Sequence, residues 1–260
     1  MKKHRKIIVS LTSFPAAIDF ATGAIKSLLN GKVIPDKIVL YVTLSQFENG
    51  RLPNQLLELE RNNSVFEIRD YPLDIRSYRK LIPALHDFPD DVIITVDDDV
   101  YYHPRMIQKL LEAHAEQPEA ILAHRAKKIA LGKPYKKWKK YRWYHFLTKK
   151  WHHGQLNIPT GCAGVLYPPN SLRKDMLDPN LFRELAPTTD DIWFWAAATA
   201  NDTEILPVPF GYNKPKSLGK PKSLSLKTIN FKGGIDRNSA ALNNILNHFN
   251  DLILKLNRGK

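Results

Sequence analysis

Residues 92–102 read VIITVDDDVYY, a run of mostly β-branched residues that leads directly into three consecutive aspartates. An apolar run of this length is typical of a strand that is buried on both faces, as strands of parallel sheets are. In open α/β sheets, ligands bind at the carboxyl ends of the strands. The sequence therefore predicts that Asp97, Asp98 and Asp99 lie at a binding edge. The alternative is an acidic turn or a helix cap.

The segments around this strand alternate between strand and helix patterns. Short apolar runs predict strands, and amphipathic segments predict helices between them. The apolar runs lie at residues 7–11, 37–43, 65–69 and 91–96, and the helical segments lie at 18–30, 52–62, 77–86 and 104–115. Such alternation is typical of an α/β fold, so we expect a Rossmann-type, mostly parallel sheet that is flanked by helices.

The second half of the chain is less regular. A short strand is predicted at 165–167, and a helix that begins with two acids is predicted at 190–200. Residues 213–227 are rich in Pro, Gly, Ser and Lys, which predicts a loop. Apolar residues at i, i+3, i+4 and i+7 spacing predict an amphipathic C-terminal helix at 239–257. The 260 residues, of which 43% are hydrophobic, suffice for one large domain.

The positive charge of the chain is concentrated in one segment. The formal net charge is +13, and residues 120–174 contain thirteen Lys and Arg but no Asp or Glu. This segment accounts for the whole excess, which indicates an anionic substrate or surface as its partner. Within it, residues 127–153 interleave lysines with seven aromatic residues. This basic aromatic segment is either an insertion that packs its rings on the domain, or a platform for an acceptor molecule or an anionic membrane.

The sequence also bears on the compartment. Cys162 is the single cysteine, so no intrachain disulfide can form. No apolar stretch approaches the length of about 18 residues that a membrane span needs. The apolar run at 7–11 is too short for the hydrophobic region of a signal peptide. We therefore expect a cytoplasmic protein with peripheral contact at the inner face of the membrane.

Three adjacent carboxylates repel one another, and a bound cation would offset this repulsion. Mg²⁺ or Mn²⁺ takes oxygen ligands, commonly one or two carboxylates together with substrate phosphates. Because side chains alternate along an extended strand, Asp97 and Asp99 would project to one side and Asp98 away from it, toward backbone donors. We therefore expect Mn²⁺ or Mg²⁺ as the cofactor, with one of Asp97 and Asp99 reaching the metal and the other a sugar hydroxyl or a water ligand.

The segment VDDDV at 96–100 resembles the DXD motif of nucleotide-sugar glycosyltransferases with the GT-A fold. Other segments occur in the chain order expected for a bacterial, glycosyltransferase 2-like family of that fold. They are SLTSFP at 10–15, SYRKLIPAL at 77–85, PTGCAGVLYPP at 159–169, TDDIWFWAAA at 189–198 and LKTINFKGG at 226–234. The resemblance extends over residues 5–250.

This resemblance implies one GT-A-like domain that spans residues 1–260. Its nucleotide-binding half would be residues 1–115, and its acceptor-binding half would be residues 116–260, with the basic segment 127–153 and the C-terminal helix 239–257. The enzyme would use the divalent metal to transfer a sugar from a nucleoside-diphosphate donor, a UDP-sugar. Its acceptor would be a glycan or a lipid-linked molecule in the synthesis of surface polysaccharides or glycoconjugates, and we expect no nucleic-acid partner.

The resemblance also implies roles for individual residues, with Asp99 as a ligand of the metal and Asp97 as a contact of the ribose or of the metal site. Phe14 would stack on the base, and Arg76 and Lys80 would approach the nucleotide or its diphosphate, because cations neutralise phosphate oxygens. Glycines at 161 and 164 would let backbone amides approach the donor sugar. The residues expected to bind the nucleotide and the donor are Thr12, Ser13, Phe14, Arg76, Lys80, Asp97, Asp98, Gly161, Ala163 and Gly164.

The pair Asp190 and Asp191 resembles the acidic motif that supplies the general base in inverting enzymes of this fold. Asp191 would take the proton of the acceptor hydroxyl, and Asp190 would steer the acceptor. Helix capping and compensation of the helix dipole would explain the same two acids without catalysis. Residues 205–237 contain no histidine that could serve as a late metal ligand, which leaves Asn230 or Asp236 as substitutes.

Two other functions are compatible with parts of this sequence. A haloacid-dehalogenase-like phosphatase also carries DxD after a strand. That class, however, expects Thr or Val where this chain has Tyr101, and it places the motif near the chain start. An RNA-binding protein would use the basic aromatic segment, because cations and aromatic rings hold single strands. That function leaves the acidic triplet and TDDIW at 189–193 unexplained.

Overall fold

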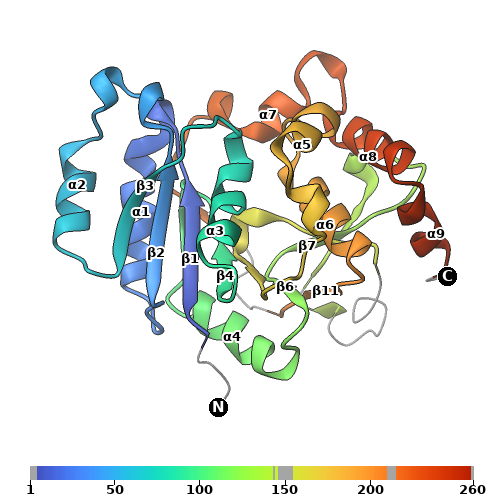
Figure 1. Ribbon diagram of the computed structural model, residues 1–260, viewed down its shortest axis with the longest axis horizontal. Helices are drawn as coiled ribbons and strands as arrows, with labels where there is room; N and C mark the ends of the chain where they lie inside the picture. Colours follow the sequence, from blue (N-terminus) through green and yellow to red (C-terminus); the bar gives the residue numbers. More distant parts are fainter. Residues whose placement is uncertain (1–4, 143, 146–154, 210–214, 259–260) are drawn as a thin grey trace.

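A seven-stranded sheet forms the centre of the molecule (Figure 1). The computed structural model describes residues 5–142, 144–145, 155–209 and 215–258. In the order in which they lie side by side, the strands are β11 (Ile205–Pro207), β6 (Ile121–Ala123), β10 (Val165–Tyr167), β4 (Val92–Thr95), β1 (Ile7–Thr12), β2 (Lys37–Val42) and β3 (Phe66–Asp70).

Most of these strands are parallel, as predicted. β1 pairs in parallel with β2 and β4, β2 pairs with β3, and β6 pairs with β11. Only β10 within this sheet runs antiparallel to both of its neighbours. Val165 at the start of β10 is in register with Thr95 at the end of β4. The segment that precedes β10, at residues 159–164, is thereby brought to the edge of the sheet where β4 ends.

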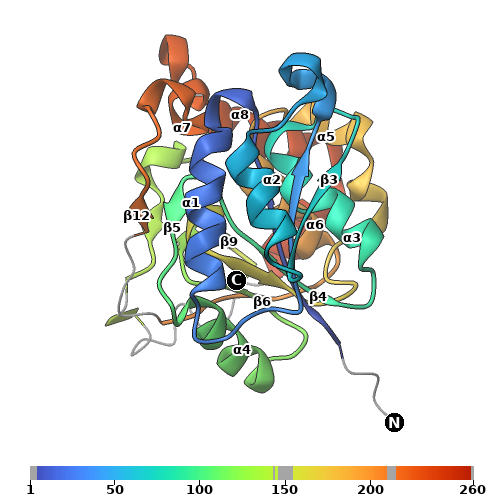
Figure 2. The same cartoon turned by 90° about the vertical axis from the view of Figure 1, so that its left-hand side faces the viewer.

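Helices cover both faces of the sheet. Alternate residues of β1 enter different hydrophobic clusters, with Ile8 in one and Val9 in the other, which explains the continuous apolar run. Figure 2 shows α1 and α2 on one side of the strands and α3 on the other. One face is covered by α1 (Ile18–Leu29), α2 (Asn54–Arg61) and α4 (Met106–Glu116), and the other by α3 (Ile82–Asp87), α5 (Pro179–Leu185), α6 (Asp190–Ala200), α8 (Arg237–His248) and α9 (Asn250–Arg258).

The predicted C-terminal helix at 239–257 is interrupted between α8 and α9. Phe249 leaves the helical conformation, with a φ of −107° and a ψ of 82°. Its ring packs against Trp193 with 6.1 Å between the ring centroids, and the Arg173 guanidinium lies over it. Apolar residues of both helices belong to the core cluster that also contains Trp193. Core packing around Phe249 therefore accounts for the break, and the apolar stripe of this segment is used by the protein core.

Two small sheets complete the fold. β5 (Val100–Tyr101) pairs with β12 (Lys216–Ser217), and β7 (Ala126–Lys128) lies between β8 (Lys139–Lys140) and β9 (Asn157–Pro159). The loop predicted at 213–227 is confirmed at residues 218–221, and it is wrong at β12, at the 3-10 helix Lys222–Leu224 and at the start of α7 (Leu226–Asn230). Residues 213–214 lie outside the described part of the chain.

The described part of the basic aromatic segment packs three of its four rings on the domain, with Tyr144 exposed, and it exposes five of its lysines. Trp138 and Tyr141 are buried, and Tyr135 is half-buried. The exposed lysines are Lys133, Lys136, Lys137, Lys139 and Lys140, while Trp143, Phe146 and Trp151 lie outside the described residues. Within the described ranges, no helix is long and apolar enough to cross a membrane.

Candidate active site

The acidic triplet follows β4 directly and lies beside the end of β1. Ser10 of β1 is in register with Thr95 of β4, so the residues that follow these two strands meet at one edge of the sheet. There the Ser13 hydroxyl donates to Asp98 Oδ2 at 2.5 Å. The structure therefore brings the loop after β1, with Ser13, to the acidic triplet.

Asp98 and Asp99 share a cation that the sequence does not reveal. Lys220 Nζ lies 2.8 Å from Asp98 Oδ1 and 2.9 Å from Asp99 Oδ2. The segment after β12 positions this lysine, because the Leu218 N–H donates to the Asp99 carbonyl at 2.8 Å. Burial raises the pKa of Asp98, although Lys220 and the Ser13 hydroxyl act to lower it. The expectation that backbone donors hold Asp98 is wrong, because its partners are a side-chain hydroxyl and an ammonium group.

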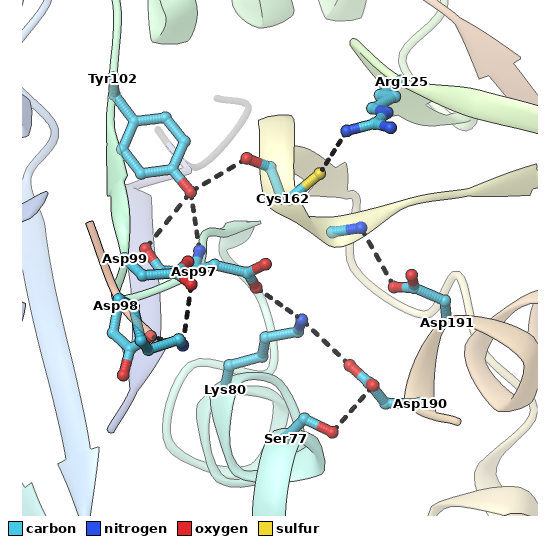
Figure 3. A network of polar contacts seen from close by, with 12 residues as sticks. Ser77, Lys80, Asp97, Asp98, Asp99, Tyr102, Arg125, Cys162, Asp190 and Asp191 are labelled. Carbon is cyan, nitrogen blue, oxygen red and sulfur yellow. Dashed lines mark hydrogen bonds and ion pairs between the residues drawn. The ribbon is translucent and has the colours of Figure 1, made fainter. Parts of the chain in front are cut away.

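Lys80 joins the triplet to the second acidic pair, as Figure 3 shows. Its Nζ lies 3.1 Å from Asp97 Oδ1 and 3.0 Å from Asp190 Oδ2. Burial by itself lowers the pKa of Lys80, but Asp190, Asp97 and Asp191 raise it well above the ordinary value. The lysine is therefore charged at neutral pH. It links carboxylates that come from the two halves of the chain.

Gly161 leaves the space in which these groups meet. A Cβ atom at this position would lie 2.7 Å from Lys80 Nζ and 3.3 Å from Asp191 Oδ1. The Gly161 N–H donates to Asp191 Oδ1 at 3.1 Å. Glycine is required at position 164 for a different reason. Its φ is 96°, which disfavours a side chain, and a Cβ there would lie 2.8 Å from Met106 Sδ. Gly161 thus belongs to the site itself, while Gly164 is explained by backbone conformation and packing.

The acidic pair opens α6 and faces this space. The Ser77 hydroxyl donates to Asp190 Oδ1 at 2.8 Å, so the buried Asp190 has a hydroxyl and the Lys80 ammonium as partners. Burial and the charge of Asp190 raise the pKa of Asp191 to about 7, although Lys80 acts to lower it. A carboxylate that titrates near neutral pH is suited to accept a proton from a substrate hydroxyl.

A buried arginine holds the loop that follows β1. Arg79 Nε donates to Thr12 Oγ1 at 2.8 Å, and its Nη2 donates to the Ser13 carbonyl at 2.8 Å. Arg79 Nη1 also donates to the Thr43 hydroxyl. The resemblance points to Arg76 rather than to Arg79, although both cations stand within the same five residues of sequence. Arg79 is therefore a residue of this site that the sequence analysis does not assign.

Three expected donor-binding residues stand apart from this network. Arg76 is exposed, has a φ of 52°, and its backbone N–H donates to Asp74. Phe14 and Ala163 are half-buried. Among the described residues, no hydrogen bond or ion pair joins the Arg76 guanidinium to the acidic groups of the site.

Tyr102, Arg125 and Cys162 also line the site without having been expected there (Figure 3). The Asp97 N–H donates to the hydroxyl of the buried Tyr102 at 2.7 Å, which fixes the backbone of the triplet. Arg125 Nη1 lies 3.1 Å from Cys162 Sγ. Burial raises the pKa of Cys162 to about 11, so this side chain stays a thiol. Tyr102 stands within VIITVDDDVYY, but no motif marks Arg125.

The residues of this edge fit a divalent cation when phosphate completes its ligands. Asp97 and Asp99 supply carboxylate oxygens, which Mg²⁺ and Mn²⁺ accept together with phosphates. The ammonium of Lys220 already lies against two carboxylates here, so the edge attracts a cation. Across the described ranges, no group of three His, Cys, Asp or Glu could hold a metal alone. The substitutes Asn230 and Asp236 make their hydrogen bonds elsewhere, to Thr188 and at the start of α8.

One known protein family matches about one third of the chain. Residues 84–174 match the family described as Glycosyl transferase family 2. This range contains the acidic triplet and the turn at Gly161, but not Asp190 and Asp191. No curated protein matches the chain in sequence.

Comparison with solved structures concerns the fold. The mannosyltransferase PcManGT from Pyrobaculum calidifontis, solved in complex with GDP-Man and Mn²⁺, superposes with a TM-score of 0.54 at 10% identity, covering 97% of this chain and 76% of that one. S. aureus TarS 1–349 gives 0.46 at 14% identity, over 77% of this chain and 58% of that one. A 4-diphosphocytidyl-2C-methyl-D-erythritol synthase gives 0.44 at 11% identity, over 83% and 94%. The first of these likenesses shows the fold class.

Proposed function

We propose that the chain is a glycosyltransferase that transfers a sugar from a nucleoside-diphosphate donor to an acceptor hydroxyl, because residues 84–174 match Glycosyl transferase family 2 and the fold is similar to that of a mannosyltransferase. The observation that carries this proposal is the row of charges from the triplet through Lys80 to Asp190 and Asp191. In this arrangement the triplet can bind a metal and the donor phosphates, and Asp191 at the other end can accept the proton of the acceptor hydroxyl. The phosphatase and the RNA-binding protein find no support in the comparisons.

The donor lies, in this proposal, at the edge formed by the loops after β1 and β4. Thr12, Ser13 and Phe14 contact the nucleotide, and Arg79 keeps their backbone in place. We take a UDP-sugar as the first donor to test. A GDP-sugar is the second, because the mannosyltransferase of the same fold was solved with GDP-Man. Asp97 and Asp99 would hold a divalent ion beside the diphosphate.

Mn²⁺ or Mg²⁺ is the metal of this proposal, held by Asp99 and Asp97. When bound, it supplies neutralisation of the diphosphate charge that develops as the nucleotide leaves. The Mn²⁺ in the solved mannosyltransferase supports this assignment. Lys220 must then release Asp99, and its ammonium becomes available to a phosphate oxygen. Asp98 keeps its bond from Ser13 and so continues to fix the loop after β1.

The transfer step uses Asp191 as the base. The acceptor oxygen forms a bond to the anomeric carbon of the sugar, and the bond from that carbon to the diphosphate breaks. The hydroxyl proton passes to Asp191, and attack from the side opposite the leaving group inverts the anomeric configuration. Asp190, held by Ser77 and Lys80, steers the acceptor. The raised pKa of Asp191, about 7, suits this task near neutral pH.

The two halves of the chain divide these tasks. Residues 1–115 form the nucleotide-binding half, since they contribute the triplet and Lys80. Residues 116–260 form the acceptor-binding half, since they contribute Asp190 and Asp191. We place the enzyme at the cytoplasmic face of a membrane, where a glycan or lipid-linked acceptor for surface polysaccharide or glycoconjugate synthesis is available.

A panel of nucleotide sugars tests the proposal. The purified chain is incubated with UDP- and GDP-sugars, with and without Mn²⁺, and release of the nucleotide is measured. We expect release from one sugar nucleotide, dependent on the metal and lost in Asp99→Asn. Release of inorganic phosphate from phosphate esters, with none of nucleotide from any sugar nucleotide, would contradict a transferase.

A further inference from the structure

The small sheet beside the site pairs lysine with lysine. β7 and β8 are antiparallel, and their register sets Lys127 opposite Lys140 and Lys128 opposite Lys139. Like charges directly opposite one another destabilise a strand pair. Two such pairs in succession are therefore unfavourable for the folded chain by itself. An anion bound on one face of the sheet would offset the repulsion between the lysines of that face.

One face of this sheet carries three cations. Side chains alternate along a strand, so Lys127 and Lys140 share one face, while Lys128 and Lys139 share the other. Arg125 stands two residues before Lys127, and its carbonyl accepts from the Thr160 N–H at 2.9 Å, which continues the pairing with β9. Arg125 therefore belongs to the same face as Lys127. We call Arg125, Lys127 and Lys140 the cationic face.

The cationic face has no carboxylate partner within the described residues. Arg125 contacts Cys162 Sγ, and Lys127 Nζ lies 3.2 Å from the centroid of the Tyr135 ring and donates to the Tyr135 carbonyl at 3.4 Å. Lys140 is exposed. The sequence offers no local compensation either, since residues 120–174 contain no acid. The charges of this face are thus available to an external anion.

The cationic face borders the proposed base. β9 leads directly to Gly161, whose N–H donates to Asp191, and Arg125 is paired with Thr160 just before that glycine. Burial, Lys140 and Arg125 lower the pKa of Lys127 to about 8, while Asp191 and Asp236 act to raise it. Lys127 is therefore close enough to interact electrostatically with Asp191. The neighbouring positive charges of Lys140 and Arg125 disfavour the charged form of Lys127, and an anion bound on this face would offset their effect.

We propose that the cationic face binds a phosphate group of the acceptor, next to the hydroxyl that Asp191 deprotonates, a proposal that rests on the transferase function given above. A phosphate carries up to two negative charges and three oxygens, which suits an arginine and two lysines. The acceptor is then a phosphorylated or phosphodiester-linked glycan, or a sugar on a lipid phosphate. Both sources present the same group to the same three side chains.

The test compares two neighbouring lysines that lie on opposite faces. Lys140→Gln and Lys139→Gln remove the same charge from exposed positions of β8, but only Lys140 belongs to the cationic face. Each variant, saturated with UDP and Mn²⁺ to fill the donor site, is titrated with glucose 6-phosphate and with glucose. We expect the wild type to prefer the phosphate ester, and Lys140→Gln to weaken its binding about ten-fold, the scale of one charge-assisted hydrogen bond. Lys139→Gln should change it less than two-fold, and Lys140→Arg should restore it, which also controls for folding.

Three results would overturn the proposal. Equal losses in Lys140→Gln and Lys139→Gln would mean that only the summed charge matters. Equal binding of glucose and glucose 6-phosphate would mean that no phosphate site exists. Unchanged glucose 6-phosphate binding in both variants, with loss of sedimentation on phosphatidylglycerol vesicles, would assign the surface to a membrane. Absence of both UDP and GDP binding in the wild type would instead contradict the transferase function, and the glucose 6-phosphate titration without nucleotide keeps the two failures apart.

Discussion

Lys80→Met is the substitution whose effect the structure defines best. The Lys80 ammonium lies 3.0 Å from Asp190 and 3.1 Å from Asp97, and the side chains of Lys80 and Asp190 are each only 8% exposed. At an effective dielectric constant of about 20, one such pair at 3 Å attracts by about 5 kcal/mol before desolvation is subtracted. Asp97 is 31% exposed, so solvent screens its share, and the pair with Asp190 dominates.

Removing one partner of a buried ion pair costs about 3–5 kcal/mol, because the other charge stays buried without compensation. We therefore expect the free energy of unfolding of Lys80→Met, measured by urea denaturation at pH 8, to fall by that amount. The matched control is Lys109→Met, which breaks an exposed pair with Glu112 whose side chains are 36% and 47% exposed. That change should cost less than about 1 kcal/mol.

A second variant separates charge from packing. In an Asp190→Asn background the uncompensated carboxylate is gone, so Lys80→Met should cost at least about 1 kcal/mol less than it costs in the wild type. If Lys80→Met costs no more than Lys109→Met, or costs the same in both backgrounds, then Lys80 does not act as the charge link of this site.

The other predictions concern catalysis and the metal. Asp191→Asn should keep donor binding and lose transfer by roughly 10²–10⁴-fold, because the acceptor proton has no base, and near-normal turnover would place the base elsewhere. The rate of transfer should rise with pH up to about 7 and then level off, since Asp191 must be deprotonated to act and its pKa is raised to that value. A rate that is flat from pH 5 to 9 would argue against this role. Lys220→Ala should bind Mn²⁺ about ten-fold more tightly without nucleotide, because Asp99 loses its competing ammonium, and an unchanged affinity would show that the two cations do not compete.

The sheet and the position of the triplet follow from local sequence. The β-branched run before Asp97 and the alternating apolar runs and helical segments carry periodicity, and periodicity predicts strands, helices and the edge where they end. The outcome agrees with the fold expected. The break at Phe249 could not be predicted in this way, because the helical pattern continues through it while its ring packs in the core.

The contacts inside the site depend on tertiary geometry that no local pattern records. Lys220 reaches Asp98 across 122 residues of sequence, from a segment whose Pro, Gly and Ser predict a loop. Arg79 rather than Arg76 holds the loop after β1, because the chain from Arg76 to Lys80 forms a 3-10 helix with a φ of 52° at its first residue, and not the start of an α-helix. The motif order indicates which segments meet, but not which side chains within them do.

Calorimetric titration of the protein with UDP and with GDP, in the presence and absence of Mn²⁺, measures whether the acidic triplet forms a nucleotide-sugar site. We expect that one of the two nucleotides binds, that binding needs the metal, and that Asp99→Asn abolishes it. Asp202→Asn, which changes an exposed acid paired with Lys255, should leave binding intact. Metal-independent binding of equal affinity in Asp99→Asn, or no binding of either nucleotide to the folded wild type, would contradict the assignment of the triplet to a nucleotide-sugar site.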